Sequence, residues 1–338
     1  MRVKVAIFAA LLALTGVSFE PTGCLAKNET GAPRAVADLG SDRALKFPER
    51  ASLGVLFWIP PGTKVDVSAK HWKMVGQAKG VVHVPKGMRL ALELGFDGAG
   101  NPSLLTAYGA DFLAALDCSK AETDDATLET IGKLTGLLAL DLRDSDFTDD
   151  GLRCLGHLKK LKDLHLSRTN LSDRGLANLL PLSSLEELSL SKTRIDDEGL
   201  KIVKKLVTLK SLSLTYVRLT DAGVAHLAAL PELTAVELDG NRGVTAQGLM
   251  QLRPLKKLTR IGLYDTGITA KDLGVMKKLS KQMPSLKIIA LSDKSFSHDK
   301  LVEWRRQLAP LVVDVEDPRV SNEDAQKLFA PLHSWSDR

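Results

Sequence analysis

The stretch LTDAGVAHLAALPELTAVEL, residues 219–238, shows how this chain of 338 residues is organised. Its last six residues have the form L-x-x-L-x-L, with Val236 at the second Leu position, and alternate apolar residues of this form face one side of a β-strand. Before them, Val224, Leu227 and Leu230 are spaced every three residues, which is typical of the apolar side of a helix. The stretch therefore predicts a helix that leads into a strand.

The same L-x-x-L-x-L form recurs with a nearly constant period along more than half of the chain. Its first five intervals are 24 residues each, and the sixth and seventh are 25 and 28 residues. A period in this range indicates a solenoid of stacked units, none of which can bury its apolar side alone. The eight copies begin at Leu113, Leu137, Leu161, Leu185, Leu209, Leu233, Leu258 and Leu286.

The Thr-Asp-x-Gly segment predicts how each helix starts. Thr220 stands where a helix N-cap belongs, and Asp221 places a negative charge at the positive end of the helix. We expect Gly223 to leave room for close packing against the neighbouring unit. Equivalent glycines occur in four other units, at Gly151, Gly175, Gly199 and Gly248.

The first 26 residues predict an export signal. Arg2 and Lys4 precede an apolar run at 5–19 that is short for a membrane span, and small residues follow it. An alternative is a lipid anchor at Cys24, because Gly precedes this Cys as in a bacterial lipobox, although Pro21 stands where that motif has Leu. We expect the protein to be periplasmic or extracellular, free or envelope-anchored, without a transmembrane span in the mature chain.

The repeats resemble those of a known family. The form LxxLxLxxTxITDxGLxxLxxL over 113–291 is similar to the bacterial leucine-rich repeats of the LTDxGL type, and to the repeats behind the F-box in eukaryotic ubiquitin-ligase receptors. The resemblance implies an α/β leucine-rich repeat solenoid, with a curved parallel sheet lined by helices, that binds other macromolecules. An export signal and the lack of an F-box-like segment argue against a ubiquitin role.

The remaining segments predict five parts of the chain. After the signal peptide (1–26) we expect a flexible linker at 27–49 and a small β-rich N-terminal region at 50–107, in which KVDV (64–67) is one of the β-like runs. The leucine-rich repeats occupy 108–292. A C-terminal cap and tail follow at 293–338, with a capped helix and a last strand over 297–315.

Catalytic and metal-binding motifs are missing from the sequence, so we expect no enzyme and no cofactor. One coincidence is the outward-facing row in which Asp141, His165 and Ser189 follow one another on adjacent predicted strands, in the residue order of a charge-relay triad. A hydrolase is the weakest alternative, because such an open sheet surface offers no obvious group to stabilise an oxyanion. We expect Cys118 in the core, without a bond to Cys154.

The predicted function is non-catalytic protein–protein recognition by the concave face of an exported solenoid. An alternative is an envelope-associated structural or polymer-binding lipoprotein. Nucleic acid is not expected as a partner, since the chain has no run of one charge sign and no aromatic residues interleaved with its lysine pairs. Binding hot spots favour Tyr, Trp and Arg, which makes the candidates on this face Arg143, His165, Arg168, Tyr216, Arg260 and Tyr264.

Overall fold

A computed structural model describes residues 41–69, 71–291 and 296–315 of the chain. Within them, one 12-stranded sheet runs through the unit formed by residues 34–338, and all neighbours from β5 to β14 are parallel. Its strands in spatial order are β3 (Lys73–Gln77), β2 (Gly54–Ile59), β5 (Arg89–Leu94), β6 (Ala115–Asp117), β7 (Ala139–Asp141), β8 (Asp163–His165), β9 (Glu187–Ser189), β10 (Ser211–Ser213), β11 (Ala235–Glu237), β12 (Arg260–Leu263), β13 (Ile288–Leu291) and β14 (Val312–Val315).

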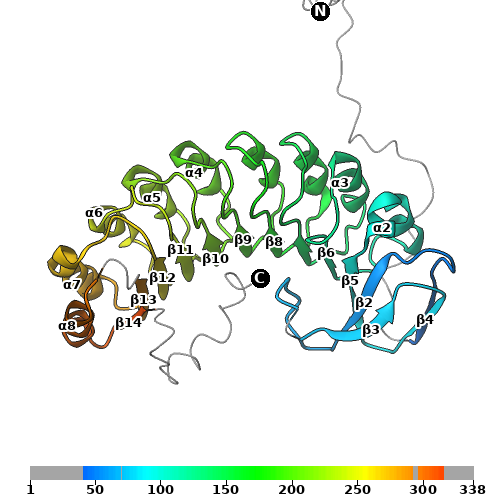
Figure 1. Cartoon of the computed structure of the whole chain (residues 1–338), viewed down its shortest axis with the longest axis horizontal. Helices are drawn as coiled ribbons and strands as arrows, with labels where there is room; N and C mark the ends of the chain where they lie inside the picture. The colour runs from blue at the N-terminus through cyan, green and yellow to red at the C-terminus, as the bar shows by residue number, and fades with distance from the viewer. Residues whose placement is uncertain (1–40, 70, 292–295, 316–338) are drawn as a thin grey trace, which may run out of the picture. The chain divides into compact units, whose positions relative to one another are not determined.

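Helices lie on the other side of the repeats, so that the strands line the inner, concave side of the array (Figure 1). In two units the predicted helix is a 3-10 helix, at Gly151–His157 and Gly175–Leu179. Further 3-10 turns occur at Pro102–Tyr108, Met250–Leu252 and Ala270–Asp272. The α-helices are α2 (Phe96–Gly100), α3 (Asp125–Ile131), α4 (Asp197–Val203), α5 (Asp221–Leu227), α6 (Ala246–Leu249), α7 (Leu273–Gln282) and α8 (His298–Leu308).

The N-terminal region continues the sheet instead of merely resting against the first repeat. Strand β2 pairs antiparallel with β3 and β5, and β5 pairs parallel with β6. The sequence predicted a flexible linker at 27–49. Within the described part of this range, however, Arg43–Lys46 forms β1, which pairs antiparallel with β4 (Val81–Val84). Phe47 follows β1 and is buried against Tyr108, which holds this segment on the folded unit.

The C-terminal end matches the sequence prediction over the residues that the structure describes. Helix α8 begins after Ser297, and β14 pairs parallel with β13, so the helix and the last strand are confirmed, but the Ser297 side chain makes no capping hydrogen bond. Trp304 on α8 is fully buried and meets Phe296 edge-on, which packs the helix against the end of the core. The predicted signal peptide, Cys24 and the C-terminal tail beyond 315 lie outside the described residues.

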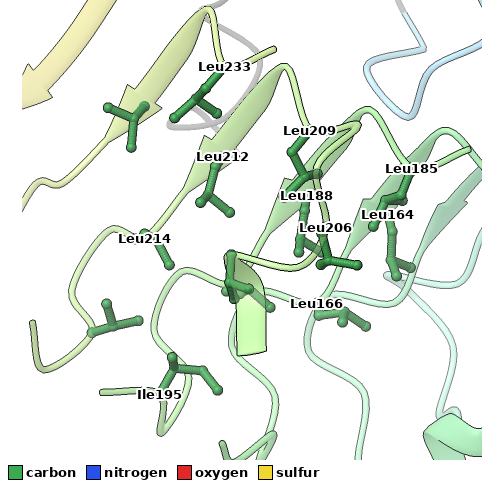
Figure 2. Packing of buried hydrophobic residues seen from close by; sticks show 14 of the residues in the cluster. Leu164, Leu166, Leu185, Leu188, Ile195, Leu206, Leu209, Leu212, Leu214 and Leu233 are labelled. Carbon is green, nitrogen blue, oxygen red and sulfur yellow. The ribbon is translucent and has the colours of Figure 1, made fainter. Parts of the chain in front are cut away.

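Leucines at equivalent positions stack from one repeat to the next. Leu164, Leu188 and Leu212 are the inward residues of β8, β9 and β10, and each is at most 1% exposed (Figure 2). One apolar cluster extends from Phe47 to Val313. Removing a buried leucine side chain costs about 2–5 kcal/mol of stability, so this continuous core is what holds the units together.

A second inter-repeat contact uses the aspartate of the Thr-Asp-x-Gly segment. The carboxylate of Asp197 accepts hydrogen bonds from the backbone N–H of Thr220 at 2.9 Å and from its hydroxyl at 2.6 Å, one repeat further on. The sequence predicted only its charge at the helix start, since the inter-repeat partner is 23 residues away. The same pairing joins Asp125 to Thr148, Asp149 to Ser172 and Asp221 to Thr245.

The glycines of this segment make room for that carboxylate, which confirms the predicted close packing. A Cβ atom on Gly223 would lie 2.2 Å from the Oδ1 atom of Asp197, much closer than real contacts allow. A Cβ atom on the equivalent glycines would meet the preceding repeat's aspartate at 2.1–2.3 Å. These glycines are Gly151, Gly175, Gly199 and Gly248.

One inter-repeat joint differs from the others. Asp196 stands where the other aspartate joints have Thr or Ser, so it offers no hydroxyl, and its backbone N–H donates to Asp173 at 3.1 Å. Burial, followed by the nearby negative charge of Asp196, raises the pKa of the Asp173 carboxyl. Two carboxylates therefore face each other at a place where the neighbouring joints have a hydroxyl donor.

We predict that Gly223→Ala lowers the free energy of unfolding by about 1–3 kcal/mol, because the new methyl group overlaps the Asp197 carboxylate. Gly274→Ala is the matched control, since nothing lies within 4 Å of a Cβ atom there and the residue is in helix α7. The control should be neutral or stabilising by up to about 1 kcal/mol. Urea unfolding of both variants measures the difference, and equal effects would contradict the packing role of Gly223.

We predict that Asp196→Thr stabilises the protein at neutral pH by about 1 kcal/mol, because it supplies the missing hydroxyl donor and still caps helix α4. Since the raised pKa makes ionised Asp173 unfavourable in the fold, the gain should shrink as the pH falls through that pKa. Thr220→Asp is the reciprocal control and should destabilise. Thermal unfolding across acidic pH tests both, and a gain independent of pH would disprove the carboxylate explanation.

Candidate functional site

The outward residues of the repeat strands form one row across the sheet, as the sequence predicts. Strand register aligns Asp141 with His165 and His165 with Ser189, and the row continues to Ser213 and Glu237. The side chains are less accessible than expected, however. Asp141 is fully buried, His165 is 4% exposed and Ser189 is 1% exposed. The middle of the row is therefore not an open surface.

The connection between β2 and β3 covers part of this face. The backbone N–H of Val67 donates a buried hydrogen bond to Oδ2 of Asp163 at 2.9 Å, and Lys64 forms an ion pair with Glu187. The residues predicted as a β-like run at 64–67 thus form a loop segment that is bound to the strands of the repeats. Its contact is also apolar, because a second buried cluster contains Ile59, Val65, Val67, Ala91, Ala114, Ala115 and Ala139.

Burial shifts the pKa values of two side chains near this loop, Asp163 and His165. Burial, and then the neighbouring charge of Glu187, raises the pKa of Asp163 well above its usual value. Burial, and then the positive charge of Arg143, lowers the pKa of His165 well below its usual value. The imidazole is therefore neutral at pH 7. Asp141 is bound by Arg143, whose Nε donates to both carboxylate oxygens at 3.0 and 2.8 Å.

The Asp141, His165 and Ser189 side chains do not form a charge relay. Nδ1 of His165 lies 4.0 Å from Oδ2 of Asp141, which is beyond hydrogen-bond distance. The hydroxyl of Ser189 is hydrogen-bonded to that of Ser167 at 2.6 Å. The alignment that suggested a hydrolase is correct in register, but the geometry gives no activated nucleophile.

The six predicted binding residues fall into different environments. Tyr216 is 52% exposed and the side chain of Arg168 is 41% exposed. Arg143 and Tyr264 are partly buried, the former against Asp141. His165 and Arg260 are buried at 4% and 8% exposure. Arg260 lies 3.7 Å from Glu237. The exposed candidates are thus at the strand ends, whereas the two buried ones lie within the sheet face.

The strand ends carry residues in an unusual backbone conformation. Asp144, Arg168, Lys192, Tyr216 and Asp265 occupy equivalent positions and have φ between +48° and +59°. In four of them the backbone N–H donates to a carbonyl of the next unit, for example from Lys192 to Thr215 at 2.8 Å. A side chain in this conformation costs roughly 1–2 kcal/mol relative to its usual backbone geometry, so Gly or Asn would fit more easily.

Tyr216 is held in place although it is exposed. The Lys192 ammonium lies 5.7 Å from the centroid of the ring, at cation–π distance. Gly240, the equivalent residue in the next unit, lies against the ring, and a Cβ atom there would be 2.2 Å from it. The aromatic ring is therefore positioned before any partner arrives.

The sequence matches a described family within these units. The profile described as Leucine Rich repeat matches residues 134–156, 157–180 and 182–201. The chain carries leucine-rich repeats. Together with the parallel sheet and its helices, these matches give an α/β leucine-rich repeat solenoid.

Comparison with solved structures finds a partial match to an internalin. Internalin C2 of Listeria monocytogenes str. 4b F2365 is 27% identical, and the alignment covers 61% of this chain and 82% of that chain with a TM-score of 0.47. No curated protein matches the chain significantly.

Four exposed cations at the strand ends of the leucine-rich repeats were not among the predicted candidates. Lys192, Arg194, Arg218 and Arg242 lie at the strand ends beside Arg168 and Tyr216. Arg194, Arg218 and Arg242 recur every 24 residues, which is a signal in the sequence. They lie beyond the strand positions on which the prediction was based. No group of three or more potential metal ligands occurs in the described ranges. Cys118 is a buried free thiol, which confirms that it is not bonded to Cys154.

We predict that Asp163→Ala frees the 60–69 loop and destabilises the protein by about 1–3 kcal/mol, because the buried Val67 N–H loses its acceptor. Asp163→Asn keeps an oxygen acceptor and removes a buried charge, so it should be at least as stable as wild type at neutral pH. Since the pKa of Asp163 is raised, that advantage should decrease as the pH falls through it. Hydrogen exchange of the Val67 amide, with thermal unfolding, measures both effects. Unchanged exchange in the alanine variant would show that Asp163 does not hold the loop.

Proposed function

We propose that this leucine-rich repeat protein recognises another protein through the strand-end side of its concave sheet, without catalysis. The observation that carries the proposal is Tyr216, which is 52% exposed yet fixed between the Lys192 ammonium and Gly240. An aromatic side chain that is ordered in advance loses little conformational entropy on binding. Tyr and Arg are also the residue types that dominate binding hot spots, and Arg168 lies on the same side.

The supporting scaffold is rigid along its length. Backbone hydrogen bonds tie the strand ends from Asp144 to Tyr216 to the next unit, and aspartate carboxylates of the preceding units bind the helix starts from Thr148 to Thr245. A stacked array of this kind keeps side chains from several repeats in fixed relative positions, which suits recognition of a large partner. His165 and Arg260 are not included in the proposed contact surface, because both are buried.

We further propose that recognition takes place outside the cytoplasm, in the periplasm or extracellular space. The support is the basic start and short apolar run of residues 1–26, and the resemblance of the repeats to the LTDxGL type of exported bacterial proteins. Among the described residues, no helix combines the length and apolar character needed to cross a membrane. Metabolic labelling with a fatty acid would separate a lipid anchor on Cys24 from simple signal cleavage.

We predict that Tyr216→Ala reduces recovery of the partner at least about tenfold when the purified chain is used for affinity capture from envelope and secreted fractions of the source cells. Val207→Ala is the matched control, since Val207 is similarly exposed at 51% but follows helix α4. Quantitative mass spectrometry of the captured proteins gives the measurement. If both variants recover the same proteins in wild-type amounts, this surface is not where the partner binds.

A further inference from the structure

The strand ends of four consecutive repeats carry positive charge and no carboxylate. We call the eight positions concerned the basic strip. Five of them are cations, the others are Asn, Tyr and Gly, and every residue with a side chain among them is exposed. The corresponding positions of the flanking repeats are acidic, at Asp144, Asp146 and Asp265. The basic strip consists of Arg168, Asn170, Lys192, Arg194, Tyr216, Arg218, Gly240 and Arg242.

The charges of the basic strip are only partly neutralised within the chain. Arg168 is paired with Asp144, Arg242 with Asp265, and Arg218 lies 3.7 Å from Asp196. Lys192 and Arg194, in the middle, are in none of the ion pairs that the described residues form at the strip. Exposed ion pairs contribute little to stability, so the arginines at either side can exchange their partners for those of a ligand.

The side chains of the basic strip lie along one line. Arg194 donates from Nη2 to the side-chain oxygen of Asn170 at 3.1 Å, and Arg218 donates from Nη2 to the backbone carbonyl of Arg194 at 2.8 Å. These contacts link three successive repeats and orient the guanidinium groups along the edge of the sheet. Arg168, Lys192 and Tyr216 stay on the strip although their backbone conformation favours glycine.

We propose that the basic strip binds an extended, Asp- and Glu-rich segment of the protein partner. The proposal rests on the proposed function and specifies the chemistry that is recognised. Adjacent repeats are about 4.8 Å apart, so the strip spans roughly 14 Å, which matches about four or five residues of extended peptide. Arg and Lys pair with the carboxylates of that segment, and Tyr216 packs against its backbone or an apolar neighbour.

A peptide fits the basic strip better than a nucleic acid does. Single-stranded nucleic acids are bound by successive aromatic rings on which bases stack, and the strip has a single ring, that of Tyr216. The cations form one narrow line bordered by carboxylates at both ends, which limits the length of an anionic partner that can be accommodated. A continuous polyanion would meet Asp144 and Asp146 on one side and Asp265 on the other.

The test uses the full chain and a fluorescent oligoglutamate peptide, with binding followed by fluorescence anisotropy at low and physiological salt. The Lys192→Glu, Arg194→Glu double variant should bind about tenfold more weakly than wild type, with a smaller dependence on salt. The matched control is Arg153→Glu with Arg174→Glu, which makes the same charge change at two exposed residues of the helical side. Thermal unfolding checks that all three proteins are folded.

The outcomes separate this inference from the proposed function. Weaker binding in the strip variant alone supports the inference. Equal weakening in the control variant shows general charge attraction and overturns it, as does tighter binding of a single-stranded oligonucleotide than of the peptide. If the wild type binds no oligoglutamate while Tyr216→Ala still loses the captured partner, the acidic-segment inference is wrong and protein recognition stands. If Tyr216→Ala captures normally, recognition at this surface fails.

Discussion

No single coil of this protein can bury its own leucines, and the whole structure follows from that limitation. Leu188 is covered because Leu164 and Leu212 lie on either side of it in the neighbouring strands. Stacking alone would leave the helix starts free to shift, and in successive repeats from Asp125 to Asp221 an aspartate prevents this by binding the cap residue of the next repeat. The two contacts fix the spacing of strands and helices together, so side chains on the sheet edge keep constant separations.

Periodic features were predictable from the sequence because they depend on local spacing. The 24-residue period predicted the strand register, including the alignment of Asp141, His165 and Ser189. The recurring glycine predicted the tight packing at Gly223. The carboxylate that requires this glycine was not predictable in the same way. It comes from the preceding repeat, and only the stacked structure shows which atoms meet.

Accessibility was the part that the sequence could not determine. The sequence predicted an open concave face. In the structure, the segment that carries Val67 is hydrogen-bonded to Asp163 on β8 and covers part of the face. Ala115 and Ala139, small residues where the following repeats have Asp163 and Glu187, leave space for this loop. Alanine at an outward strand position is a weak signal, because nothing in a linear pattern says which distant segment will fill the gap.

The similarity of most joints between repeats has a consequence for the evolution of such a chain. Four joints pair an aspartate carboxylate with both the backbone N–H and the hydroxyl of a Thr or Ser, so a recombination event that deletes or duplicates one 24-residue unit between them brings compatible surfaces together again. The β2–β3 hairpin, the β1–β4 pair and the α8–β14 closing unit are not copies of the repeat. The length of the parallel sheet can therefore change in evolution by one strand spacing at a time, about 4.8 Å, while the fold stays the same.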